Sequence, residues 1–105
     1  MALSVIVLSV AMLGLSAAAG STNPSDLCGV LAKNAVSAWQ KKNPSFGYLQ
    51  DFLGTKGSAS STDTYRFRCY GEDGECWKDI LVTAQESEDS SCKILKVKAR
   101  VQVCN

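Results

Sequence analysis

The side chains able to do chemistry in this 105-residue chain are cysteines, carboxylates and basic residues, because the sequence contains no histidine. Without histidine, the Ser-His-Asp and Cys-His arrangements that activate a nucleophile are excluded, and the commonest metal ligand is missing. No two cysteines form a C-x-x-C pair, and the scattered glycines form no phosphate-binding or dinucleotide-binding loop. We therefore expect a protein that is not an enzyme and that needs neither a cofactor nor a metal.

Carboxylates gather in two short segments, residues 72–75 and residues 86–89. Paired carboxylates can carry out acid–base chemistry, but they need a pocket that shields them and shifts their pKa values. Both segments have the composition of exposed turns, so we expect their carboxylates to be solvated.

Five cysteines are an odd number, so one is free or pairs with another chain. Cys28 is far from the others in sequence, and we expect it to be the unpaired one, buried on a helix. A disulfide-linked homodimer through Cys28 and an intrachain bridge from the helix are the alternatives. The disulfide candidates are the remaining four, namely Cys69, Cys76, Cys92 and Cys104. A Cys69–Cys76 bridge across a hairpin and a Cys76–Cys104 bridge between neighbouring strands both stay open.

Basic residues form a stripe on the last predicted strand. Lys96, Lys98 and Arg100 alternate with apolar residues, so they share one face of that strand. Arg66 and Arg68 alternate in the same way and could extend the stripe over a neighbouring strand. Such a face could bind a heparan-like polyanion or an anionic membrane, or it could simply be a solvated sheet face. The net charge of only +1 does not force attraction to nucleic acid, and we do not expect nucleic acid as a partner.

A helix must come first among the elements that position these side chains. Asn23 can cap it, Pro24 suits its first turn and Asp26 complements its dipole. Asn43-Pro44 ends it. The apolar face that recurs at helical spacing consists of Leu27, Leu31, Ala35, Ala38 and Trp39, flanked by Cys28, Ala32 and Val36.

Strands are predicted after the helix. Residues 46–53 could form one, followed by a mobile loop rich in Gly, Ser and Thr over residues 54–64. Three further strands are predicted over residues 64–70, 76–85 and 95–103, separated by turns. The last has the strictest alternation, which predicts a buried face of Leu95, Val97, Ala99, Val101 and Val103. Trp39 and Trp77 are expected in the core. Together these elements predict an α+β fold, with one N-terminal helix packed on an antiparallel sheet of three or four strands and stabilised by disulfides.

The first 19 residues have the pattern of a secretory signal peptide. They contain no charged side chain, an apolar run covers residues 3–15, and the small residues 17–19 suit cleavage. We expect a single small domain over residues 20–105 that is secreted and extracellular. All five cysteines lie within it, where an oxidising compartment allows disulfides to form.

Two segments resemble the cystatin family. Residues 35–42, AVSAWQKK, are similar to the end of that family's helix, and residues 50–54, QDFLG, are similar to its Q-x-V-x-G hairpin with Phe in place of Val. Cys69, Cys76, Cys92 and Cys104 would stand for the family's four C-terminal cysteines. Cystatins enter the active-site cleft of papain-like proteases as a wedge. The resemblance therefore implies that Gln50, Phe52 and Gly54 lie at a hairpin tip and contact a protease.

The sequence thus favours a secreted, non-enzymatic binding protein with a protein target, and a cystatin-like inhibitor of papain-like cysteine proteases is the specific hypothesis. The alternative is a venom toxin or host-defence effector that binds anionic membranes or polyanions. Its binding surface would be the basic face made by Arg66, Arg68, Lys96, Lys98 and Arg100.

Overall fold

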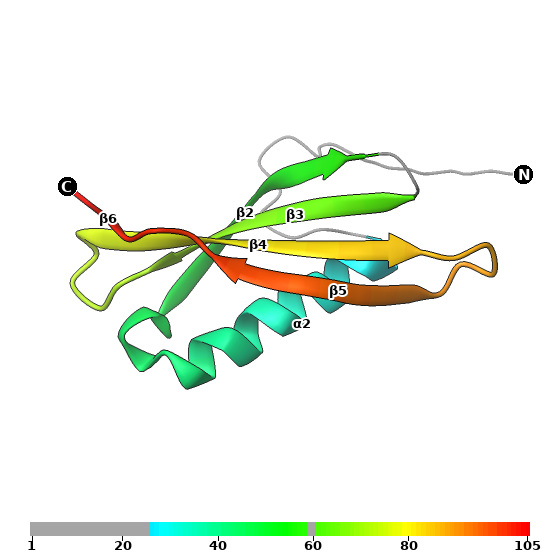
Figure 1. Ribbon diagram of the computed structural model, residues 1–105. Helices are drawn as coiled ribbons and strands as arrows, with labels where there is room; N and C mark the ends of the chain where they lie inside the picture. Colours follow the sequence, from blue (N-terminus) through cyan, green and yellow to red (C-terminus); the bar gives the residue numbers. More distant parts are fainter. Residues whose placement is uncertain (1–25, 59–60) are drawn as a thin grey trace, which may run out of the picture.

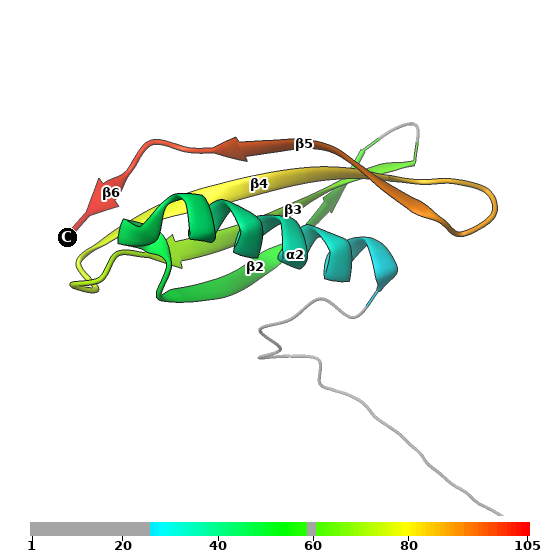
Figure 2. The same cartoon turned by 90° about the horizontal axis from the view of Figure 1, so that it is seen from below.

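In the described part of the chain, one helix lies along one face of an antiparallel sheet, and no helix or strand covers the other face (Figure 1, Figure 2). The computed structural model describes residues 26–58 and 61–105. Its elements are the helix α2 (Leu27–Lys42), a short 3-10 helix (Pro44–Phe46), and the strands β2 (Leu49–Gly57), β3 (Thr62–Tyr70), β4 (Cys76–Glu86), β5 (Cys92–Ala99) and β6 (Val103–Cys104). The predicted α+β fold is confirmed.

The sheet is a meander in which each strand pairs with the next, in the order β2-β3-β4-β5. The short β6 pairs with the beginning of β4, beyond the end of β5. The prediction of one continuous strand over residues 95–103 is therefore wrong. The chain leaves the ladder after Ala99, although the Arg100 N–H still donates to the Asp79 carbonyl oxygen at 2.8 Å.

The helix ends at Lys42, just before Asn43-Pro44, as predicted. Its N-cap residue is Asp26, and the predicted start at Asn23-Pro24 lies outside the described residues. The buried stripe runs through Cys28, Gly29, Ala32, Val36 and Gln40. This stripe is centred about one position away from the predicted face, so Leu27 is exposed.

The core lies between α2 and the two central strands. The helix-facing side chains of β3 and β4 are fully buried, namely Tyr65, Phe67, Cys69, Ile80, Val82 and Ala84. On β5 only the first half packs against this core, through Cys92 and Ile94. The predicted buried face of the last strand is wrong, because an irregularity in the β4–β5 pairing skips Leu95 and because α2 does not cover the second half of β5. Val97 remains 41% exposed and Val101 85% exposed.

The segment predicted as a mobile loop, residues 54–64, is mostly strand. β2 continues to Gly57 and β3 begins at Thr62, so the connection is short. The β2–β3 register shifts between Phe52 and Gly54, and Gly54 adopts a φ of 135°, which L side chains rarely adopt. The glycines of this segment belong to an irregular strand, and residues 59–60 of the predicted loop lie outside the described residues.

The disulfides are Cys28–Cys92 and Cys76–Cys104, and Cys69 is a buried free thiol. The prediction that Cys28 is unpaired is wrong, because the start of α2 lies beside the start of β5. Cys28 is therefore not available for a bridge between two chains. The candidate Cys69 is also wrong as a disulfide partner, because its register partners are Gln50 and Lys78 and it faces the core. Of the two bridges left open, Cys76–Cys104 is confirmed.

Two disulfides are typical of proteins that fold in an oxidising, extracellular or secretory environment. Among the described residues, no helix has the length and apolar character needed to span a membrane. The predicted signal peptide, residues 1–19, and its cleavage site lie outside the described residues.

Candidate polyanion-binding face

We call the side of the sheet that does not carry α2 the outer face. Because successive side chains on a strand point to opposite sides, the register places outer-face residues in rows across the strands. One row contains Asp51, Arg68 and Asp79, with Arg100 beside Asp79. The next row contains Gly54, Arg66, Leu81 and Lys98, and the one after it Lys56, Thr64, Thr83 and Lys96.

All five predicted basic-face residues therefore share the outer face: Arg66, Arg68, Lys96, Lys98 and Arg100. Lys56 and Lys93 join them, because their register partners also point outward. Only two carboxylates, those of Asp51 and Asp79, belong to these rows. Seven basic side chains against two acidic ones give the outer face a positive excess, although the net charge of the chain is only +1.

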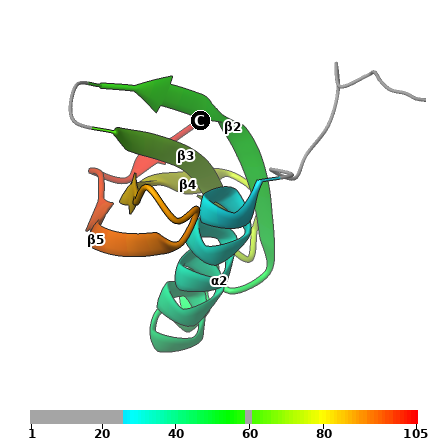
Figure 3. The same cartoon turned by 90° about the vertical axis from the view of Figure 1, so that its right-hand side faces the viewer.

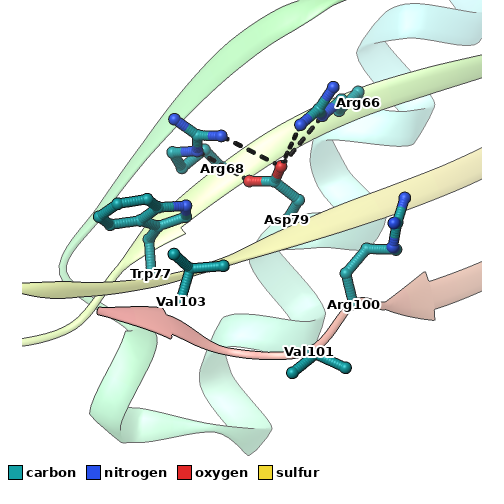
Figure 4. A pocket seen from close by; sticks show the side chains of 7 residues that line it. All are labelled: Arg66, Arg68, Trp77, Asp79, Arg100, Val101 and Val103. Atoms are coloured by element: carbon teal, nitrogen blue, oxygen red, sulfur yellow. Dashed lines mark hydrogen bonds and ion pairs between the residues drawn. The ribbon is translucent and has the colours of Figure 1, made fainter. Parts of the chain in front are cut away.

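The carboxylate of Asp79 holds two of the arginines in fixed positions (Figure 4). Arg66 donates from Nε at 3.0 Å and from Nη2 at 2.5 Å to Oδ2. Arg68 donates from Nε at 2.8 Å to Oδ1 and from Nη2 at 3.2 Å to Oδ2. Asp79 is only 8% exposed. Burial alone would raise its pKa, but the hydrogen bonds and charges of the two guanidinium groups outweigh that effect and lower it.

Trp77 also contacts this cluster, through Arg68. The Arg68 guanidinium carbon lies 5.0 Å from the centroid of the Trp77 ring, a cation–π contact. The prediction that both tryptophans are in the core is confirmed for Trp39, which packs against the core. For Trp77 it is wrong, because β4 points this side chain to the outer face.

A hollow of about 390 Å³ lies over the cluster. It is lined by Arg66, Arg68, Trp77, Asp79, Arg100, Val101 and Val103 (Figure 4). A second hollow, of about 500 Å³, adjoins it and shares Arg66 and Arg100. The two form a shallow trough on the outer face.

The role of Asp79 and Trp77 was missed by reasoning from the sequence. The signal that could have found Asp79 is an acidic residue on the outward side of β4, at the position that pairs with Arg68 across the β3–β4 hairpin.

The residues of the predicted protease contact are not at a hairpin tip. Gln50 turns toward α2, where its Nε2 donates to Gln40 at 2.8 Å and to Ser37 at 3.2 Å. The Phe52 ring packs on Phe67, with ring centroids 5.2 Å apart. Gly54 lies at the irregularity within β2. The expected placement is wrong because β2 continues to Gly57, three residues beyond the motif.

The acidic turns are built from local hydrogen bonds. In the turn after β4, Asp89 accepts hydrogen bonds from Ser87 and Ser91, and these lower its pKa to about 2. In the turn after β3, Asp73 accepts from the Glu75 N–H. No group of three or more potential metal ligands comes together in residues 26–58 and 61–105.

The chain matches no protein-family model, no curated protein and no solved structure. The outer face, with its ordered arginines and its excess of positive charge, is therefore the feature that points to a function.

Proposed function

We propose that this protein is a secreted, non-enzymatic binding protein that holds a linear polyanion, of the sulfated-polysaccharide class, on its outer face. The observation that carries the proposal is the positive excess on the sheet face that no element of residues 26–58 and 61–105 covers. Along β3 and β5 the basic residues of this face recur at every second position, about 7 Å apart, which suits a polymer with closely spaced anionic groups.

The shape of the sheet favours a linear polymer over a membrane. The strands twist across the sheet, as the end-on view shows (Figure 3). A flexible chain can follow a twisted face over its whole length, whereas a planar bilayer touches only part of it.

The test is binding to heparin at increasing salt concentration, with two double variants that remove the same charge. Lys96→Gln/Lys98→Gln removes two charges from the outer face, and Lys41→Gln/Lys42→Gln removes two from the exposed end of α2. We expect the outer-face variant to lose affinity by about threefold to tenfold and to show a shallower salt dependence. The α2 variant should bind like the wild type.

Equal losses in both double variants, or no heparin binding by the wild type, would overturn the proposal. Vesicles that contain phosphatidylserine provide the second arm of the experiment. Binding to vesicles without binding to heparin would assign the outer face to membranes instead.

A second candidate function is inhibition of papain-like cysteine proteases. The order of one helix followed by a four-stranded meander supports it, since the resemblance to cystatins implies that order. The chain also turns from β2 into β3, and from β4 into β5, at the end of the sheet where α2 begins (Figure 1). Inhibition would have to use that end, because Gln50 and Phe52 face α2 and the core.

Titration against papain tests this second function. Tight inhibition that does not change with salt would support it, because a wedge excludes water and depends little on long-range charge. If the protein does not inhibit papain at micromolar concentration, the resemblance to cystatins would concern the fold and not the function.

A further inference from the structure

We propose that the hollow over Asp79 is a discrete subsite for one sugar unit carrying two anionic groups, and that this subsite, rather than overall charge, makes polyanion binding selective. The inference depends on the proposed function above, because it concerns the same outer face.

The hydrogen-bond donors of the subsite are already ordered in the folded protein. Arg66 and Arg68 share the Asp79 carboxylate, and Arg68 also rests on the Trp77 ring. A free arginine loses considerable rotamer freedom when it binds a ligand. Here that freedom has already been lost on folding, so an anion in the hollow meets two positioned guanidinium groups.

The guanidinium groups of Arg66 and Arg68 also keep N–H donors that can bind a ligand. Arginine has five N–H donors, and both Arg66 and Arg68 use only Nε and Nη2 on Asp79. The Nη1 groups remain for an incoming oxyanion. Arg100 lines the same hollow, and the structure gives it no ion pair among the described residues.

The charge and shape of the hollow also suit such a sugar unit. Three guanidinium groups and one carboxylate leave two positive charges, which matches a sugar unit with two sulfates, or with one sulfate and one carboxylate. Trp77, Val101 and Val103 supply an apolar side against which a sugar ring can pack. A volume of about 390 Å³ lies within the range of small-ligand sites, and the adjoining hollow lets the polymer continue.

The decisive experiment uses a substitution for which the two explanations predict opposite signs. Asp79→Asn removes one negative charge from the outer face, so the net charge of that face rises by one, and it weakens the support of Arg66 and Arg68. If overall charge governs binding, this variant binds a fully sulfated heparin tetrasaccharide more tightly than the wild type. If the subsite governs binding, it binds about tenfold more weakly.

Asp51→Asn is the matched control for charge. It makes the same change on the same face, but Asp51 accepts its hydrogen bond from the Tyr70 hydroxyl and not from either arginine. We expect the affinity of this variant for the tetrasaccharide to stay equal or to rise. A rise in affinity for Asp79→Asn as well would overturn the subsite.

A second pair keeps the proposal falsifiable if Asp79→Asn does not fold. Arg100→Gln removes a charge inside the hollow, and Lys93→Gln removes one from the far end of the outer face. We expect a loss of about tenfold for the first and less than about threefold for the second. Equal losses would contradict a discrete subsite.

Fluorescence locates the bound sugar. In a Trp39→Phe background, Trp77 is the only tryptophan, and the tetrasaccharide should change its emission. Tripolyphosphate, which has charge but no ring, should bind more weakly and change the emission less. If long heparin binds but the tetrasaccharide leaves Trp77 unchanged, the subsite is wrong while the polyanion-binding function stands. If long heparin does not bind, the function itself fails.

Discussion

The side-chain amide of Gln50 donates a hydrogen bond of 2.8 Å to the side-chain oxygen of Gln40 and so joins β2 to the buried face of α2. Gln40 is only 8% exposed, and its own amide donates to the carbonyl oxygens of Phe46 and Leu49 at 2.9 and 3.3 Å. Gln50 belongs to the segment that resembles the cystatin Q-x-V-x-G motif. In this fold it instead attaches the C-terminal end of α2 to the sheet.

Replacing Gln50 by alanine should destabilise the fold by about 1–3 kcal/mol, because it leaves the buried oxygen of Gln40 without this donor. The measurement is the free energy of unfolding in urea. Gln102→Ala is the control, since Gln102 is exposed, and it should change stability by less than about 0.5 kcal/mol. A Gln50→Ala effect as small as that of the control would show that the Gln40–Gln50 contact is not structural.

The central strands could be predicted from the sequence because α2 covers them. Tyr65 and Phe67 in β3, and Ile80 and Val82 in β4, recur at every second position in the sequence, and all four side chains are fully buried. The same alternation failed for the last strand. A period of two shows which residues share a face, but it cannot show whether another element covers that face.

The candidate site, like the sheet, could be predicted from the sequence only in part. Local alternation was enough to place Arg66, Arg68 and the lysines of β5 on one face. The function of Asp79 depends on which strand pairs with β3 and in which register. The partner of Cys28 depends on where the helix crosses the sheet. Both are contacts between distant parts of the chain, which no local pattern specifies.

The Cys28–Cys92 disulfide should contribute more stability than Cys76–Cys104. It closes a loop with a sequence separation of 64 residues, against 28 for the other. Loop-closure entropy gives about 4 kcal/mol for a loop of that length. It also holds α2 to β5, whereas Cys76–Cys104 holds only the two residues of β6, which can detach without exposing the core.

The measurement for this prediction is the free energy of unfolding of two double variants, Cys28→Ala/Cys92→Ala and Cys76→Ala/Cys104→Ala. We expect a loss of about 4 kcal/mol for the first and a smaller loss for the second. Equal losses, or the reverse order, would contradict the view that β6 is peripheral.

Cys69 should resist alkylation in the folded protein. Its side chain is fully buried, and this burial, together with the charge of Asp79, raises the pKa of the thiol to about 12, so almost no thiolate exists at pH 8. Without reductant, iodoacetamide should label one cysteine in guanidinium chloride and none in buffer. Peptide mapping should place the label on Cys69. Rapid labelling of the native protein, or a label on Cys28, would contradict the disulfide pairing.

The ion pairs of Asp79 should make stability depend on pH in the acidic range. Hydrogen bonds from Arg68 and Arg66 lower the pKa of Asp79 below its ordinary value of 3.8 despite its burial. The folded state therefore binds the proton less readily than the unfolded state. The stabilisation is fully present above pH 3.8 and is lost as the pH falls through the lower, folded-state pKa.

Unfolding curves of the wild type and of Asp79→Asn, measured from about pH 7 down to about pH 2, test this, because all other carboxylates contribute to both proteins. The difference in unfolding free energy should be constant near neutral pH and should shrink below pH 3.8. A difference that stays constant to the lowest pH would mean that the charge of Asp79 does not stabilise the fold.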